Sequence, residues 1–314
     1  MKVIVQIPCL NEEKTLPLVI KSIPKKIPGV DSIEILVIDD GSTDKTVKVA
    51  KSLGVKHFVH HTRNQGLGRS FHDGVIQALE LGADIVVNTD GDNQYPQAAI
   101  TELVQPIIHG TADIVIADRQ VGTIEHFSPF KKALQKLGSH IVNTAAGTNV
   151  PDAASGFRAY SRQSIMTLNT ITRFSYCMET IIQAGNKRLA ISSIPITVNA
   201  KTRESRLFKS THEHVYKSAM AIIRAYVMYR PYIAFNTLGT VMVVLGLIPF
   251  LRYMYFALQS EHGSHIQSLL VGSILLIGAF LAFVMGILAD LIRINRILLE
   301  DTLEHTKAMR FDDK

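Results

Sequence analysis

The sequence predicts an α/β protein in which a mostly parallel, Rossmann-like sheet is followed by two membrane-spanning helices. Short apolar segments alternate with segments of helical periodicity through the first half of the chain, as in βαβ units. Acidic and polar residues directly follow several of these strands, and two long uncharged apolar runs lie in the C-terminal third. These observations predict a ligand-binding sheet with a membrane anchor.

The expected elements follow in chain order. The first buried strand is Val3–Ile7, which ends at Pro8 and precedes the turn PCLNEE and a helix over Thr15–Lys21. Further strands are expected at Glu34–Ile38, Lys56–His60, from Ile85, at Ile114–Ala117 and at Phe157–Tyr160, with helices over Lys45–Leu53, Arg69–Leu81 and Tyr176–Gln183. Ser42 or Thr43 is the expected N-cap of the second helix.

Polar turns follow four of these strands and, in a parallel sheet, should meet at one edge. They are Pro8–Glu13, Asp39–Asp44, Asp90–Gln94 and Asp118-Arg119. Carboxylates there can accept hydrogen bonds from a base or ribose, and glycine-rich backbone can hold phosphates. Any one such turn is also explained as a helix cap, but four turns at one edge favour a ligand site.

The Asp90-Gly91-Asp92 segment is the centre of this prediction. In an extended backbone, residues i and i+2 point the same way, so both carboxylates could share one hard cation. Gly91 would let a bulky ligand approach the backbone closely. The alternative is a strand followed by an acidic turn that caps a helix.

Composition limits the partners. The formal charge of +6 suits an anionic partner, and without an arginine-rich or aromatic-interleaved patch we expect a phosphorylated substrate or a membrane surface, not nucleic acid. Two cysteines are too few for a disulfide scaffold and fit a reducing compartment. The N-terminus begins as a strand, not as a signal peptide.

Ser128–Ala146 reads as an amphipathic helix carrying Lys131, Lys132 and Lys136. One interpretation lays this helix on an anionic membrane with a lysine near the lipid phosphate. The other is an ordinary surface helix with a solvated charged face.

The C-terminal third predicts a membrane hairpin. An amphipathic juxtamembrane helix is expected over residues 212–231, membrane helices over about 232–257 and 267–291 within 232–292, and a tail over 293–314. Lysine and arginine flank the outer ends of the two runs, so the positive-inside rule predicts an integral membrane protein with both termini and the domain that carries the sheet cytoplasmic. Glycines in both runs permit close helix packing within one chain or between chains, which leaves a homo-oligomer open.

Five motifs together carry a resemblance to a known family: PCLNEE, DDGSTD, the N-x-G-L-G turn, D-G-D and DAASGFR. In this order they resemble the family 2 glycosyltransferases, which have the GT-A nucleotide-sugar fold. The layout of the chain is similar to that of the polyprenyl-phosphate glycosyltransferases, the group that contains dolichol-phosphate mannose synthase. The resemblance assigns residues 1–211 to the catalytic domain.

The resemblance also implies roles for individual residues. It places nucleotide-sugar contacts at Pro8, Leu10, Asn11, Glu12, Asp39, Asp40, Asp90, Gly91 and Arg119, and Mg²⁺ or Mn²⁺ ligands at Asp90, Asp92 and Gln94. Catalytic roles fall to Asp92, Glu179 and Arg203, and contacts to the acceptor or its phosphate to Lys132, Ser155, Arg158, Arg203 and Arg206. Leu10 departs from the family pattern, which often has an aromatic residue there, so stacking on the base is lost.

The implied reaction is inverting transfer of a hexose from a UDP- or GDP-sugar to a polyprenyl or dolichyl phosphate. Such an acceptor is already anionic and needs no strong base. Two alternatives remain: transfer to a glycan or glycolipid hydroxyl with Glu179 as general base, and a scaffold subunit without turnover. The absence of tryptophan excludes a Q-x-x-R-W acceptor motif and weighs against the first.

Overall fold

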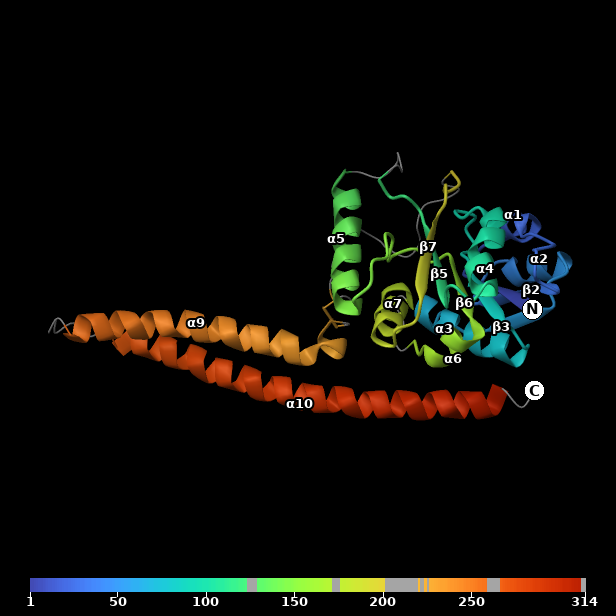
Figure 1. The fold of residues 1–314 in the computed structure, drawn as a ribbon. Coiled ribbons are helices and arrows are strands. Elements are labelled where there is room, and N and C mark those ends of the chain that lie inside the picture. Colours follow the sequence, from blue (N-terminus) through green and yellow to red (C-terminus); the bar gives the residue numbers. More distant parts are fainter. Residues whose placement is uncertain are drawn as a thin grey trace. The chain divides into compact units, whose positions relative to one another are not determined.

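The computed structural model describes residues 1–122, 129–170, 176–200, 220, 223–224, 226–258 and 266–311 (Figure 1). Contacts divide the chain into two compact units, one formed by Met1–Ile222 with Glu300–Lys314 and the other by Ile223–Leu299. The C-terminal residues beyond the apolar runs therefore belong to the unit that carries the sheet.

Within the described residues, the first unit is built on one seven-stranded sheet with the order β3-β2-β1-β4-β6-β5-β7. Its strands are β1 (Lys2–Cys9), β2 (Ser32–Asp39), β3 (His57–His60), β4 (Ile85–Asn88), β5 (Ile114–Asp118), β6 (Arg158–Ser161) and β7 (Ile191–Pro195). Strand β6 pairs antiparallel with both β4 and β5, and the other pairings are parallel. The predicted mostly parallel sheet is confirmed.

Helices cover both faces of the sheet. They are α1 (Leu16–Ser22), α2 (Thr46–Ser52), α3 (Leu67–Glu80), the 3₁₀ turn η1 (Gln97–Ala99), α4 (Ile100–Ile108), α5 (Pro129–Ala146), α6 (Arg162–Thr167) and α7 (Tyr176–Asn186). Alternating residues of β1, such as Val3 and Val5, pack in one core with residues of α1, α2 and α4. On the opposite face α3 lies against the sheet, where a Cβ on Gly74 would come within 2.9 Å of Ile38.

The predicted N-cap of α2 is wrong. The carboxylate of Asp44 accepts the hydrogen bond from the backbone N–H of Thr46 at 2.9 Å. Ser42 instead accepts from the N–H of Asn11 at 2.9 Å, so its hydroxyl joins two strand-end turns. Within the described residues, α4, α6, the 3₁₀ turn η1 and β7 were not expected from the sequence.

The second unit contains α9 (Pro231–Leu258) and the first part of α10 (Ile266–Phe311). Both helices are long and apolar enough to cross a membrane. Their glycines lie at the contact between them, because a Cβ on Gly239 would be 2.7 Å from the ring of Phe283 and one on Gly272 would be 2.5 Å from that of Phe250. The glycines therefore serve packing within one chain.

Helix α10 continues without a break to Phe311, and its end packs on the first unit. The Lys307 ammonium is buried and donates to the carbonyls of Met166 and Leu168, both at 3.1 Å, and to Asn169 Oδ1 at 2.7 Å. Arg310 pairs with Glu80. Residues 293–314 were expected as a tail, and the structure shows their larger part as a helix docked beside α6.

Candidate active site at the carboxyl edge of the sheet

Strand pairing brings the predicted turns to one edge of the sheet. Cys9 at the end of β1 pairs with Asp39 at the end of β2, which in turn pairs with His60 at the end of β3. Strand β6 runs in the opposite direction, so its first residue, Arg158, lies beside Asn88 at the end of β4. The segment that precedes β6 therefore starts from the same edge as the D-G-D turn.

Asp90 and Asp92 lie in the turn after β4 and not in the strand, which ends at Asn88. The argument from strand alternation therefore does not apply to them. The turn has its own geometry: Asn93 adopts a φ of 61°, and Asp92 Oδ1 accepts from the N–H of Gln94 at 3.1 Å. Asp90, Asp92 and Gln94 are all half-buried.

Two glycines set how closely the chain approaches this turn. A Cβ on Gly91 would lie 3.0 Å from Cys9 Sγ and 3.3 Å from Glu12 Cγ, so the D-G-D turn packs directly on the turn after β1. A Cβ on Gly156 would lie 3.4 and 3.5 Å from the two oxygens of Asp90. The DAASGFR segment thus reaches the Asp90 carboxylate.

Several carboxylates of this cluster lie around the buried Cys9 thiol. Burial raises the pKa of the Cys9 thiol well above its ordinary value, and the carboxylates of Glu12, Asp39 and Asp90 raise it further. Carboxylates from three different strand ends therefore act on one point. Among the described residues no group of three or more His, Cys, Asp or Glu side chains is arranged to hold a metal ion by itself. Asp90, Asp92 and Gln94 carry oxygen atoms of the kind that bind a hard cation together with substrate phosphates and water.

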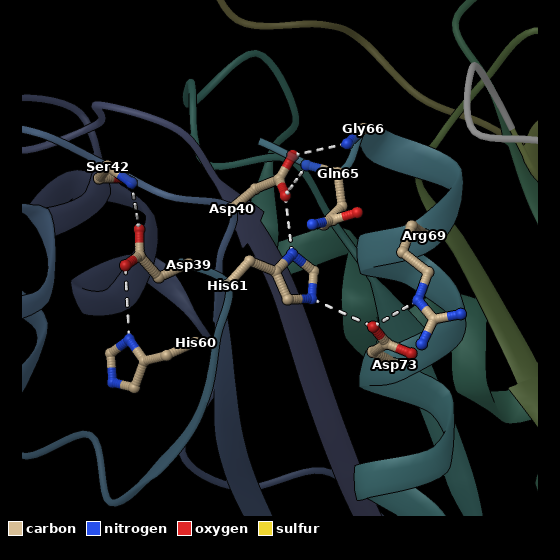
Figure 2. A network of polar contacts seen from close by, with 9 residues as sticks. All are labelled: Asp39, Asp40, Ser42, His60, His61, Gln65, Gly66, Arg69 and Asp73. Atoms are coloured by element: carbon tan, nitrogen blue, oxygen red, sulfur yellow. Dashed lines mark hydrogen bonds and ion pairs between the residues drawn. The ribbon is translucent and has the colours of Figure 1, made fainter. Parts of the chain in front are cut away.

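The residues predicted to line the nucleotide pocket lie in turns that are joined by hydrogen bonds. Asp39 is buried, accepts from the N–H of Ser42 at 3.0 Å, and has its other oxygen 3.4 Å from His60 Nδ1 (Figure 2). Asn11 Oδ1 accepts from the N–H of Thr43 at 2.7 Å, so this side chain joins the first two turns. Pro8 is buried at the end of β1, followed by half-buried Leu10.

Glu12 and Asp40 are also buried and hydrogen-bonded. Glu12 Oε2 accepts from the hydroxyl of Thr15 at 2.6 Å. Asp40 accepts from the N–H groups of Gln65 and Gly66 at 2.8 and 3.0 Å. Both carboxylates hold neighbouring turns in place, a role that the sequence pattern did not indicate.

The structure does not place Arg119 and Arg158 as phosphate ligands. Arg119 forms a two-point ion pair with Asp152, with Nε and Nη2 at 2.6 and 2.9 Å from its oxygens. Arg158 is fully buried and donates to the carbonyls of Ser155, Ala153 and Cys177 and to the Thr180 hydroxyl. Arg158 therefore ties the DAASGFR turn to α7, because a buried guanidinium must satisfy its donors.

The other predicted acceptor and catalytic residues lie as follows. Lys132 on α5 donates to the carbonyl of Gly122 at 2.9 Å. Ser155 is fully buried, and its Oγ has no hydrogen-bond partner among the described residues. Glu179 is buried at the start of α7. Two predicted features lie outside the described residues: the pair Arg203 and Arg206, and most of the juxtamembrane helix expected over 212–231. Both remain predictions.

The sequence did not predict the side chains that bind Gly156, the residue next to the Asp90 carboxylate. Asn88 Nδ2 donates to the carbonyl of Gly156 at 3.0 Å and to the hydroxyl of Tyr176 at 2.6 Å, and the Tyr176 hydroxyl donates to the same carbonyl at 2.8 Å. Tyr95 accepts from the N–H of Gly156 at 3.1 Å. Asn88 could have been noticed as a polar residue that ends an apolar strand run, whereas the tyrosines carry no local signal.

Comparison with known proteins adds the family. The profile of glycosyl transferase family 2 matches residues 4–168. The chain is 31% identical, over 211 residues, to UDP-N-acetylglucosamine–dolichyl-phosphate N-acetylglucosaminyltransferase of Methanococcus voltae, which covers 60% of this chain and 82% of the relative. It is 28% identical to polyprenol monophosphomannose synthase of Mycolicibacterium smegmatis (62% and 77% covered) and 29% identical to undecaprenyl-phosphate mannosyltransferase of Micrococcus luteus (66% and 88% covered).

Among solved structures, glucosyl-3-phosphoglycerate synthase of Mycobacterium tuberculosis has a similar fold. The TM-score is 0.55 at 24% identity, with 72% of this chain and 78% of that chain covered. That crystal structure contains Mn²⁺, UDP and glucosyl-3-phosphoglycerate. At this identity the likeness establishes the fold and nothing more specific.

Proposed function

This chain belongs to glycosyl transferase family 2, and from that premise we propose that it transfers a hexose from a nucleotide sugar to a polyprenyl or dolichyl phosphate at a membrane. The observation that carries the proposal is the similarity to three relatives named for lipid-phosphate acceptors, across most of their length. Two long apolar helices on the same chain as the strand-edge carboxylates support a lipid acceptor.

The donor site is proposed at the carboxyl edge of the sheet. Asp39, buried between the first three strand ends, would accept hydrogen bonds from the base or the ribose. Asp90, Asp92 and Gln94 would hold Mg²⁺ or Mn²⁺ on the diphosphate, and a divalent ion bound there would neutralise the charge of the leaving group. Gly91 and Gly156 let the turn after β1 and the DAASGFR segment pack closely on the D-G-D turn.

The proposed reaction is a single in-line displacement. A lipid phosphate oxygen attacks the anomeric carbon, the new C–O bond forms as the bond to the nucleoside diphosphate breaks, and the anomeric configuration inverts. Because the attacking oxygen is already ionised, no residue must remove a proton. Glu179 would then orient substrate or protein groups, and Arg203 and Arg206 would contact phosphates through their forked donors.

We also propose that the catalytic unit and both termini share the cytoplasmic side. The residues after the second apolar run pack on the catalytic unit through Lys307 and Arg310. Two membrane crossings return the chain to the side from which it entered, which agrees with this contact. The arginines near both outer helix ends, including Arg230 and Arg293, support the same orientation.

Sugar transfer by the purified full-length chain in detergent tests the proposal. UDP-glucose, UDP-N-acetylglucosamine and GDP-mannose are each supplied with undecaprenyl or dolichyl phosphate, with and without Mn²⁺. We expect one donor to give a mild-acid-labile glycolipid together with free nucleoside diphosphate, dependent on the divalent ion. Saturable nucleotide binding without any lipid product from the three donors would contradict the proposal.

A further inference from the structure

The turn of residues 62–66, with the sequence TRNQG, lies directly against the strand end that carries Asp39. The N–H of His61 donates to the carbonyl of Asp39 at 2.9 Å. A Cβ on Gly41 would lie 2.8 to 2.9 Å from backbone atoms of Arg63 and Asn64, so the two turns touch through their backbones. Gly66, with a φ of 93°, then leads into α3.

One buried carboxylate fixes this turn. Asp40 accepts from the N–H groups of Gln65 and Gly66 and lies 2.7 Å from His61 Nδ1 (Figure 2). A buried carboxylate with three such partners is held in one position, because losing any of them leaves a charge incompletely satisfied. Asp40 thereby joins the end of β2 to the start of α3.

The other ring nitrogen of His61 faces a second carboxylate. His61 Nε2 lies 3.1 Å from Asp73 on α3, and Figure 2 shows the ring between the two acids. Asp73 also receives Arg69 Nε at 2.8 Å and lies 3.1 Å from His72 Nδ1. Burial opposes ionisation of Asp73, but the hydrogen bonds from His72 and Arg69 hold its pKa below the ordinary value. Asp73 is therefore an acceptor for His61.

The two ring nitrogens of His61 lie on different edges of the imidazole, so one side chain reaches both carboxylates. The side chain of His61 is only 9% exposed, so water has little room to replace a lost bond.

We propose that His61 is a positioning residue that links Asp40 after β2 to Asp73 on α3 and so holds the 62–66 turn against the nucleotide site. The inference rests on the proposed nucleotide site at Asp39. When the link through His61 is removed the turn loosens, and the nucleotide binds only the fraction of molecules in which the turn is in place. Nucleotide affinity should therefore fall when His61 is replaced.

Several charged groups face this site and must be separated in the test. They are Asp39 and Asp40 after β2, His60 on β3, and Arg69, His72 and Asp73 on α3. Of these, His60 is the alternative source of an effect on nucleotide binding, because its Nδ1 is 3.4 Å from Asp39 and its side chain is 48% exposed. His57 supplies a matched control: it lies at the other end of β3 and pairs with Glu34.

The first measurement is amide hydrogen exchange of the ligand-free, full-length chain in detergent, comparing His61→Gln, Asp73→Asn and His57→Gln with the wild type at one pH. A glutamine can bond only one of the two acids, so we expect the Gln65 and Gly66 amides to exchange about tenfold faster in His61→Gln. Asp73→Asn should give a smaller increase and His57→Gln none. Unchanged exchange in both His61→Gln and Asp73→Asn would overturn the inference, whether or not the chain binds nucleotide.

The second measurement is the Kd of UDP and of GDP with Mn²⁺ at one pH for the wild type, His61→Gln, His60→Gln and His57→Gln. We expect His61→Gln to bind about tenfold more weakly than the wild type, and His57→Gln to bind as the wild type does. A loss of affinity in His60→Gln without one in His61→Gln would assign the effect to His60 and overturn the inference. Failure of the wild type to bind either nucleotide would count against the proposed donor site, while the exchange result still decides the role of His61.

Discussion

At the scale of single residues, Asp92 is the sharpest test of the proposed metal site. Its carboxylate is half-buried in the turn after β4 and accepts from the N–H of Gln94, so the effect of its replacement on stability is measured beside the effect on activity. We expect Asp92→Ala to lower sugar transfer at least about 100-fold, because the leaving diphosphate loses its counter-charge. Transfer assays over a Mn²⁺ series, with thermal unfolding beside them, measure both effects. Asp301→Ala, an exposed position on α10, is the control, and full activity of Asp92→Ala would remove Asp92 from the site.

Tyr176 tests whether the hydrogen bonds to Gly156, next to Asp90, affect catalysis. Its hydroxyl accepts from Asn88 Nδ2 and donates to the carbonyl of Gly156. Burial raises the pKa of Tyr176 well above its ordinary value, so the hydroxyl keeps the proton that it donates. Tyr176→Phe leaves the ring in place and removes both bonds, which should lower the free energy of unfolding by about 1–2 kcal/mol. Because Gly156 lies against the Asp90 carboxylate, we also expect a lower kcat at saturating donor. An unchanged kcat would mean that Tyr176 serves stability alone.

At the scale of elements, the end of α10 is part of the catalytic unit, and Lys307 allows this contact to be titrated. Burial lowers the pKa of Lys307 to about 8, Lys187 lowers it further, and Glu304 opposes the shift. The folded unit therefore holds this proton less tightly than the unfolded chain. The contribution of Lys307 to stability should rise with pH from about 8 towards its ordinary pKa near 10.4, and should be lowest and constant below that range.

Thermal unfolding of the wild type and Lys307→Met at several pH values measures this contribution. The difference between the two proteins should increase in favour of the wild type above about pH 8. Lys56→Met, at an exposed lysine before β3, should show no such trend. A difference that stays constant with pH would show that Lys307 contributes by packing and not by its charge.

The order of strands and helices was largely predictable from the sequence, and their pairing was not. Buried strands such as β1 and β4 show as apolar runs, because both faces of a central parallel strand are covered. Nothing local says that β6 runs antiparallel, yet this reversal brings Gly156 to Asp90. Likewise the acidic turns were found at the right edge, but whether Arg158 meets a substrate or the protein interior depends on distant chain segments. The Cys177 carbonyl and the Thr180 hydroxyl, two of the groups that accept from Arg158, come from α7, which the motif does not contain.

At the scale of the whole molecule, the remaining question is on which side of the membrane each segment lies. Cys9 and Cys177 are both buried, so a single added cysteine can be labelled selectively with a membrane-impermeant maleimide. Met309 is 68% exposed near the end of α10, and Glu261 belongs to the connection between the two apolar helices. Met309→Cys and Glu261→Cys therefore report on the two ends of the second helix.

In sealed vesicles of known orientation, the two variants should be labelled from opposite sides, with Met309→Cys reacting on the cytoplasmic side. The contact of Lys307 with the carbonyls of Met166 and Leu168 requires the end of α10 and the catalytic unit to share one compartment, because neither can reach the other across a bilayer about 30 Å thick. Labelling of both variants from the same side would mean that the apolar helices do not both cross, and the two-span anchor would have to be replaced by a hairpin that enters and leaves one face. Labelling from opposite sides but with Met309→Cys outside would place the catalytic unit away from cytosolic nucleotide sugars and would contradict the proposed orientation.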